Sequence, residues 1–246
     1  MDIERGKNFL ETLSKDQVLL LYNVLNFDVK VISWDLDQIL SKTEEPVKEA
    51  FDAELGTNYK IRKIDRWRAL TAWAVYDRVL SEKEASRIED RLWSNPDILL
   101  QAPPVEIMRR YSRSAHNLGL EQFVVTSRPP GLKNSTFKWL SIHYPWIPSQ
   151  NILIRRDFRI DGDGFKALSV SRLTPNVHFD DSVLSAREIL KCCRTPIFLF
   201  PRAMEVGAFA RDRVIEFPEM DLWRDFLEAY SVGASSHNID ISASSM

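Results

Sequence analysis

Two aspartates, Asp35 and Asp37, stand two positions apart after a short β-branched and aromatic run at residues 29–34. Such a run is typical of a strand buried in a sheet, and the turn that follows a strand can aim both carboxylates at one point. A carboxylate pair can bind Mg²⁺ through its oxygens, or it can divide into a nucleophile and a proton donor. The pair therefore predicts a metal site or a site of covalent catalysis.

Three further groups that suit phosphate chemistry stand beside later apolar runs. Thr126 and Ser127 precede an expected helix start, where hydroxyls and backbone N–H groups can bind phosphate. Lys166 follows an acidic, glycine-containing loop and can neutralise a phosphate. Asp180 and Asp181 form a second acid pair that can complete an oxygen-only Mg²⁺ site. Each group alone is more often a solvated turn or a helix cap, so the inference depends on their order.

The elements that must position these groups alternate along the second half of the chain. Short apolar runs separated by helix-like segments are typical of an α/β fold, a Rossmann-like parallel sheet with helices on both faces. In such a sheet, ligands bind beyond the carboxyl ends of the strands, which is where these groups stand. The expected strands are residues 29–34, 122–125, 151–154, 176–179 and 196–200, and the expected helices are residues 132–143, 165–171, 183–193 and 221–230.

The first strand and the later ones are separated by a long insert. Residues 41–117 are rich in helix formers and punctuated by prolines, and we expect them to form a helical cap inserted after the first strand. Residues 29–40 and 118–230 then make up the α/β core.

Both ends of the chain differ from this core. Apolar residues at helical spacing predict a helical arm over residues 1–28, with a possible break at Ser14, that packs against the body. The serine-rich residues 231–246 are expected to be a disordered tail.

The composition of the 246 residues excludes a disordered, collagen-like or repeat-biased chain. With 44% hydrophobic and 28% charged residues, the chain is typical of a globular protein, and its net charge of −2 gives no strong nucleic-acid signal. No stretch approaches the roughly 18 apolar residues that cross a bilayer, and no signal-peptide core follows the start. The adjacent Cys192 and Cys193 suit a reducing compartment, so we expect a cytoplasmic protein without a membrane partner. The oligomeric state stays open.

The order of the chemical groups resembles the haloacid dehalogenase (HAD) superfamily of phosphohydrolases. The resemblance covers residues 29–230: acid pair, hydroxyl, lysine and acid pair stand beside strand ends, with a helical insert after the first. Within that superfamily, the chain is more similar to the 5'(3')-deoxyribonucleotidase-like branch. This narrower likeness rests on the segments VISWDLD, FVVTSRPPGLKNSTFKWL and VHFDDS followed by SAREIL.

The resemblance implies a phosphomonoester hydrolase that forms a phosphoaspartate on Asp35. Asp37 would protonate the leaving oxygen and then activate water. Thr126, with Ser127 beside it, would hold the phosphoryl oxygens, and Lys166 would pair with the phosphate and with the nucleophile. Such a reaction depends on in-line positioning and on charge neutralisation.

The resemblance also implies a cofactor and a class of partner. Mg²⁺ would be held by Asp35, by the main-chain carbonyl of Asp37, and by one or both of Asp180 and Asp181. The partner would be a small phosphorylated substrate, with 5'-nucleotides as one candidate.

One residue departs from the family pattern. Family members usually have glycine directly after the second aspartate, whereas this chain has Gln38. If the position requires a positive φ, a residue with a Cβ adds strain of about 1 kcal/mol, and its side chain can crowd the leaving-group side. Gln38 therefore favours an alternative function, a catalytically silent protein that binds a phosphorylated ligand or a protein partner.

The insert offers aromatic and cationic side chains that could select a substrate. Arg66, Trp67 and Trp73 could stack a base and hold a second polar group of a nucleotide-sized molecule. The alternative interpretation makes both tryptophans part of the core of the cap. Two more residues leave alternatives open: Arg128 could contact ligand or pair with a surface carboxylate, and His178 is expected to be a satisfied core histidine.

Overall fold

A six-stranded parallel sheet forms the centre of the computed structural model, which describes residues 3–64, 68–202 and 213–233. The strands are β1 (Val31–Trp34), β2 (Glu121–Thr126), β3 (Ile152–Ile154), β4 (Val177–Asp180), β5 (Ile197–Leu199) and β6 (Val214–Glu216). Their order is β3-β2-β1-β4-β5-β6, and every neighbouring pair is parallel. The predicted α/β fold is thereby confirmed.

The edge strand β6 is absent from the sequence prediction. A segment of three residues is too short to display a strand period. It becomes a strand through tertiary pairing, since Val214 to Glu216 lie in register with Ile197 to Leu199 of β5. On its other side, the Gln17 side chain donates a hydrogen bond of 2.6 Å to the carbonyl of Val214.

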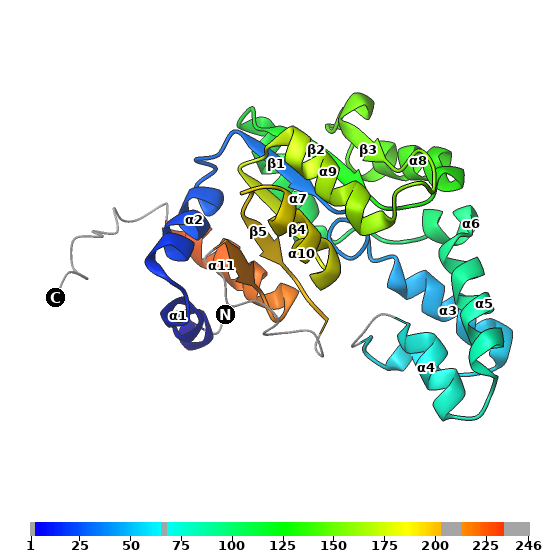
Figure 1. Ribbon diagram of the computed structural model, residues 1–246. Coiled ribbons are helices and arrows are strands. Elements are labelled where there is room, and N and C mark those ends of the chain that lie inside the picture. Colours follow the sequence, from blue (N-terminus) through cyan, green and yellow to red (C-terminus); the bar gives the residue numbers. More distant parts are fainter. Residues whose placement is uncertain (1–2, 65–67, 203–212, 234–246) are drawn as a thin grey trace.

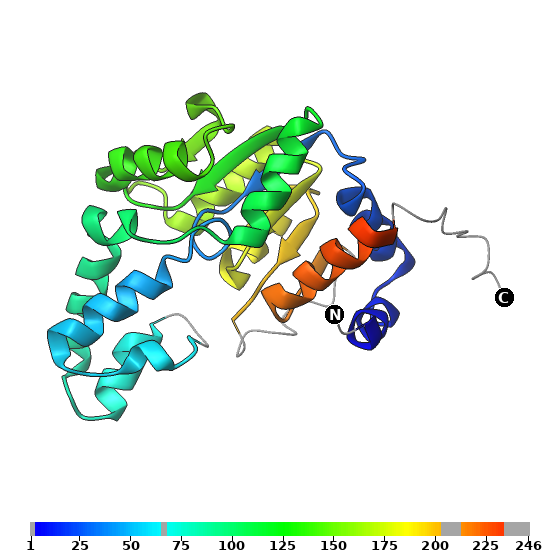
Figure 2. The same ribbon diagram turned by 180° about the vertical axis from the view of Figure 1, so that it is seen from behind.

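Helices cover both faces of the sheet. One face carries α9 (Gly162–Leu173) and α10 (Val183–Cys192), whose apolar side chains pack with those of β5 and β6. The opposite face carries α7 (Glu106–Asn117), α8 (Lys133–His143) and α11 (Met220–Gly233). Figure 1 shows α9 and α10 in front of the sheet, and Figure 2 shows α7 and the orange-red α11 from behind.

Alternation along β1 explains how this strand serves both faces. Ile32 and Trp34 are fully buried in the cluster beneath α7 and α11, where the Trp34 ring lies 4.5 Å from the ring of Phe179. Ser33, between them, points to the other face and meets His178 of β4. Packing on both faces therefore fixes the carboxyl end of β1 and with it the position of the next residue, Asp35.

The segment between β1 and β2 begins with four helices that pack on one another and that we call the cap. They are α3 (Glu44–Leu55), α4 (Ala69–Tyr76), α5 (Glu82–Trp93) and α6 (Pro96–Leu100). These helices enclose an apolar cluster of their own and project beyond the sheet in Figure 1. The next helix, α7, lies within the predicted insert 41–117, but it buries Met108, Tyr111 and Ala115 against the sheet.

The N-terminal arm consists of α1 (Ile3–Glu11) and α2 (Lys15–Leu25) and packs on the same chain. The break predicted at Ser14 is confirmed: its side chain accepts from the Gln17 N–H, and the Gln17 side chain accepts from the Ser14 N–H. The Phe9 ring lies 5.3 Å from Phe217 and 5.7 Å from Phe226.

The C-terminal helix α11 runs to Gly233, beyond the predicted end at residue 230, and the rest of the predicted tail lies outside the described residues. Within the described ranges, every helix is too short or too polar to cross a bilayer.

Candidate active site

The strand register brings the two acid pairs together. β1 and β4 are direct neighbours, with Trp34 opposite Phe179, and the backbone N–H of Asp35 donates to the Phe179 carbonyl at 2.8 Å. The strand order reverses at this point, because the chain leaves β1 for β2 and β3 and returns to β4 on the other side. Parallel sheets bind ligands at such a reversal. Asp35, Asp180 and Asp181 are all buried here, and each offers an oxygen within 4.8 Å of the others.

Lys166 lies between these carboxylates. Asp161 caps α9 by accepting from the Gly164 N–H at 2.7 Å, which fixes the helix start and thus the lysine near its first turn. Lys166 Nζ lies 3.0 Å from Asp35 Oδ2 and 3.1 Å from both carboxylate oxygens of Asp180. Burial alone would lower the pKa of this lysine, but Asp180 and Asp35 raise it above its ordinary value. The site therefore holds a permanent positive charge beside the candidate nucleophile.

The three carboxylates differ in their affinity for protons. Burial raises the pKa of Asp35 well above its ordinary value, against the opposing charge of Lys166. Burial likewise raises the pKa of Asp181 to about 6. Burial would also raise the pKa of Asp180, but Lys166, the hydrogen bond with His178 and the Ser182 N–H lower it to about 2. A divalent cation would thus compete with protons at two of these three groups.

His178 supports Asp180 from inside the sheet. Its Nε2 lies 3.1 Å from Asp180 Oδ2, and its Nδ1 lies 2.8 Å from Ser33 Oγ, with all three side chains fully buried. Because an ionised carboxylate only accepts hydrogen bonds, Nε2 is the donor, and Nδ1 accepts from the serine hydroxyl when the ring is neutral. The predicted satisfied core histidine is confirmed, and it also orients a candidate metal ligand.

Asp181 is tied to the cap through an arginine that the sequence analysis does not identify. Arg202 Nη2 lies 3.2 Å from Asp181 Oδ2 and 2.9 Å from Glu44 Oε1, the first residue of α3. Arg202 stands shortly after β5, so the strand-end rule that selected the other groups could have found it.

The second acid of the first pair has a different environment. Asp37 accepts from Arg128 through both carboxylate oxygens, at 2.7 Å from Nη2 and 3.1 Å from Nε, and from Thr43 Oγ1 at 2.5 Å. Arg128 is 4% exposed and Asp37 is partly buried, so the predicted pairing of Arg128 with a carboxylate is confirmed, but its partner lies in the site and not at a surface.

The turn after Asp37 requires a positive φ at Gln38, the case in which a residue with a Cβ adds strain. Gln38 has φ of 64°, which favours glycine, and its N–H donates to the Ser41 carbonyl at 2.7 Å. Its side-chain Nε2 is buried and meets no hydrogen-bond acceptor among the described residues. The chain therefore maintains a strained residue beside the two catalytic candidates.

The predicted phosphate turn follows β2. Ser127 lines the pocket described below, whereas Thr126 is fully buried and its Oγ1 accepts from the Arg128 N–H at 3.3 Å. Gly162, at the start of α9, approaches Ser127 so closely that a Cβ on the glycine would lie 2.9 Å from the serine Cβ. Only glycine therefore permits this approach of α9 to the turn.

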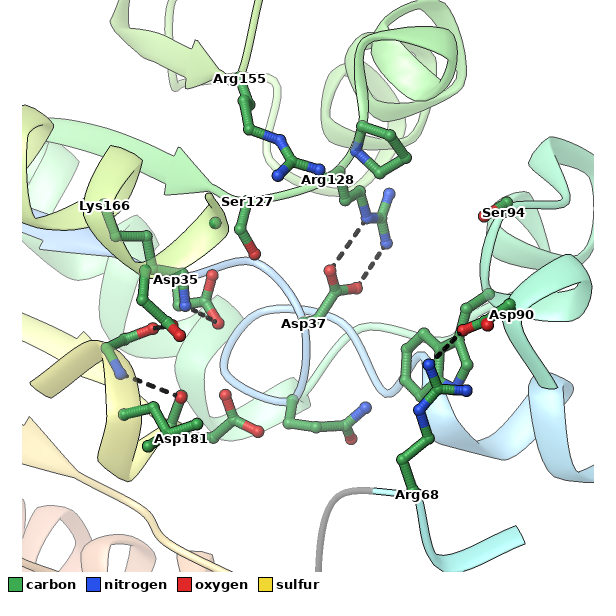
Figure 3. Close-up of a pocket in the computed structure, with 18 of the residues that line it drawn as sticks. Asp35, Asp37, Arg68, Asp90, Ser94, Ser127, Arg128, Arg155, Lys166 and Asp181 are labelled. Carbon is green, nitrogen blue, oxygen red and sulfur yellow. Dashed lines mark hydrogen bonds and ion pairs between the residues drawn. The ribbon is translucent and has the colours of Figure 1, made fainter. Parts of the chain in front are cut away.

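A pocket of about 580 Å³ opens between these residues and the cap, and Figure 3 shows its labelled side chains. The core contributes Asp35, Asp37, Ser127, Lys166 and Asp181, and the cap contributes Arg68, Asp90, Trp93 and Ser94.

Of the predicted selecting residues, Arg66 and Trp67 lie outside the described residues. Trp73 packs against the apolar cluster of the cap, 5.7 Å from the Tyr59 ring, and does not line the described part of the pocket.

Comparisons with known proteins agree with this architecture. No family model matches the chain, and no curated protein is significantly similar to it. Solved structures do match. A predicted phosphatase from Clostridium acetobutylicum is 13% identical with a TM-score of 0.52, covering 81% of this chain and 99% of its own. A hydrolase of the haloacid dehalogenase-like family from Streptococcus pneumoniae is 11% identical with a TM-score of 0.52, covering 80% of this chain and 98% of its own. The chain has the HAD fold.

This likeness extends to the fold and no further. Protein Tyrosine Kinase A of Mycobacterium tuberculosis is 14% identical with a TM-score of 0.53, covering 81% of this chain and 98% of its own. Proteins named as phosphatase, hydrolase and kinase therefore share this architecture, so a function must be argued from the site. The comparisons give no support to the nucleotidase-like branch in particular.

Proposed function

We propose that this protein is a Mg²⁺-dependent phosphomonoester hydrolase that forms a phosphoaspartate on Asp35. The observation that carries the proposal is the contact of 3.0 Å between Asp35 and Lys166 at the base of the pocket. It places a candidate nucleophile and a permanent cation at one point, beside a hydroxyl-bearing turn. Phosphoryl transfer needs this combination of positioning and charge neutralisation.

The proposed roles follow from the positions of the side chains. Asp35 attacks phosphorus in line with the leaving oxygen, so a bond from its carboxylate oxygen forms as the ester P–O bond breaks. Lys166 neutralises charge on the nucleophile and on the transferred group. Ser127 and the backbone N–H groups of its turn bind phosphoryl oxygens, and buried Thr126 shapes that turn through its contact with Arg128. The leaving oxygen departs as an alkoxide and takes its proton from solvent. Asp37 accepts a proton from the water that hydrolyses the phosphoaspartate and then returns that proton to solvent, which closes the cycle.

The residues present fit a magnesium ion. Asp35, Asp180 and Asp181 form a buried set of oxygen donors, and such a set is typical of Mg²⁺ sites. These carboxylates would hold the ion, together with the main-chain carbonyl of Asp37. When bound, the ion supplies positive charge to the phosphoryl oxygens.

The substrate is a small phosphorylated molecule that fits between core and cap. A 5'-nucleotide is one candidate, and a cytoplasmic location is part of the same proposal. The cap borders the leaving-group side through residues such as Trp93 and Ser94, so substrate selection is assigned to these helices.

Phosphate release tests the proposal. Purified protein is assayed with and without Mg²⁺ on 4-nitrophenyl phosphate and on a panel of nucleoside and sugar monophosphates. We expect metal-dependent turnover that is lost in Asp35→Asn and retained in Glu188→Gln, a control at a carboxylate of α10 outside the pocket. Trapping of radiolabelled phosphate on the wild type, and not on Asp35→Asn, tests the phosphoaspartate.

A second candidate function is a catalytically silent protein that binds a phosphorylated ligand or a protein partner. It is favoured by the state of Asp37, whose two carboxylate oxygens are both occupied by Arg128. In that case, inorganic phosphate would bind the folded protein with Mg²⁺, while no compound of the panel would be hydrolysed.

A further inference from the structure

The cations that line the pocket differ in whether an acid neutralises them. Four of them form ion pairs with carboxylates of the chain: Arg68 with Asp90, Arg128 with Asp37, Lys166 with Asp35 and Asp180, and Arg202 with Glu44 and Asp181. A fifth pocket cation, Arg155, has no carboxylate within ion-pair distance in the described parts of the chain.

Arg155 is held in place without such a partner. It directly follows β3, and its guanidinium carbon lies 4.8 Å from the centre of the Phe158 ring. Its Nε is shielded from solvent and meets no hydrogen-bond acceptor among the residues that the structure describes. Figure 3 shows the side chain entering the pocket from the side of Ser127 and Arg128. The result is a cation held against an aromatic ring, for which the described residues provide neither a carboxylate partner nor an acceptor for Nε.

The backbone of Arg155 starts at a distance from the candidate nucleophile. β3 lies two strands from β1, so the ends of these strands are about 10 Å apart at the usual strand spacing. The transferred phosphoryl group sits on Asp35, at the end of β1, where Lys166 already supplies a positive charge. A side chain that enters the pocket from the end of β3 can therefore contact the part of a substrate that lies away from Asp35.

We propose that Arg155 binds a second oxyanion group, a carboxylate or a phosphate, on the leaving-group part of the substrate. The inference rests on the proposed function and narrows its substrate class to phosphomonoesters with a further negative charge. A guanidinium binds both kinds of oxyanion through paired N–H donors, and the Phe158 ring limits its motion. A 5'-mononucleotide, whose leaving nucleoside is neutral, would leave Arg155 without a partner.

Matched pairs of substrates test this assignment. 3-Phosphoglycerate is compared with glycerol 3-phosphate for the carboxylate, and fructose 1,6-bisphosphate with fructose 6-phosphate for the second phosphate. The wild type is expected to have the higher kcat/KM for the doubly anionic member of at least one pair. In Arg155→Met this preference should fall about 10- to 100-fold, the usual effect of losing a charge-assisted hydrogen bond. Arg155→Lys should retain part of it.

Arg156→Met is the matched control, because Arg156 is the exposed neighbour in sequence and does not line this pocket. It should keep the wild-type preference. An equal loss on both members of each pair in Arg155→Met would place Arg155 at the transferred phosphoryl group and overturn the proposal. A preference for the doubly anionic substrates that is unchanged in Arg155→Met would overturn the proposal as well.

A binding measurement separates this inference from the proposed function. The same four compounds are titrated calorimetrically into Asp35→Asn and into the double variant with Arg155→Met. Tighter binding of a doubly anionic compound that requires Arg155 supports the inference, even if the wild type hydrolyses nothing and the proposed function fails. Hydrolysis without any dependence of the preference on Arg155 supports the proposed function and overturns the inference.

Discussion

Arg128 holds both carboxylate oxygens of Asp37, with Nη2 2.7 Å from Oδ1 and Nε 3.1 Å from Oδ2. Burial by itself would raise the pKa of Asp37, but the charge and hydrogen bonds of Arg128, with the Thr43 hydroxyl, lower it below its ordinary value. Asp37 is therefore a carboxylate at neutral pH. In that state it can accept a proton from water, and it is poorly suited to protonate a leaving oxygen.

The weak proton donation by Asp37 can be tested by measuring kcat/KM for a series of aryl phosphates whose leaving phenols differ in pKa. Because Asp37 donates a proton poorly, we expect wild-type kcat/KM to rise steeply as the pKa of the leaving phenol falls. Arg128→Met should make this dependence shallower, since the freed Asp37 is protonated more easily. Equal slopes in the two proteins would show that Arg128 does not control proton donation.

Removal of Arg128 should also destabilise the protein. Arg128→Met leaves Asp37 partly buried without its cation, and we expect a loss of about 1–3 kcal/mol near neutral pH. A lowered pKa stabilises the fold above the ordinary pKa of aspartate, and this contribution disappears as pH falls through the folded-state value.

Urea unfolding of the wild type and of Arg128→Met at several pH values checks this prediction. The difference between their free energies of unfolding should shrink towards strong acid. Arg109→Met, which breaks an exposed pair with Glu106, is the control and should cost no more than about 1 kcal/mol.

Magnesium binding should depend on pH through the raised pKa values of Asp35 and Asp181. A raised carboxyl pKa means that the folded protein holds its proton more tightly, so metal-free stability falls as pH rises from the ordinary aspartate value to about 6. The cation binds the deprotonated form, so Mg²⁺ should raise the melting temperature more at about pH 7 than at about pH 5.

Thermal scans with and without MgCl₂ give this shift directly. Asp181→Asn should reduce the shift and its pH dependence, whereas Asp157→Asn, outside the pocket, should behave as the wild type. A shift that is the same at both pH values would argue against these ligands.

The strained turn at Gln38 predicts an unusual effect of glycine. At φ of 64° a residue with a Cβ carries strain, so Gln38→Gly should be about 1 kcal/mol more stable than Gln38→Ala. Alanine is the right comparison, because both variants remove the buried Nε2 that has no acceptor among the described residues. Chemical denaturation of the two variants measures the difference, and a more stable alanine variant would contradict the prediction.

The sequence predicts the acidic part of the site well, for a physical reason. The carboxyl ends of neighbouring parallel strands lie at the same end of the sheet, so Asp35, directly after β1, comes close to Asp180, the last residue of β4. The same rule extends to Arg155 after β3 and Arg202 after β5, which are not among the predicted site residues.

Other features depend on tertiary structure that no local pattern encodes. The fork between Arg128 and Asp37 requires two turns to approach across the sheet edge, and β6 exists through its pairing with β5. For Trp73, both interpretations begin from the same helical spacing, and only packing against Tyr59 places its ring in the cluster of the cap.

The paired contacts of Arg202 join the start of the cap to the floor of the site. One guanidinium contacts both Glu44 on α3 and Asp181 beside β4, so the two segments share a counter-charge. A displacement of α3 that takes Glu44 away would remove one of the two carboxylates that contact Arg202, and a cation that recruits Asp181 would weaken the other contact. A change at either end of this pair of contacts would therefore alter the electrostatic environment of the other end.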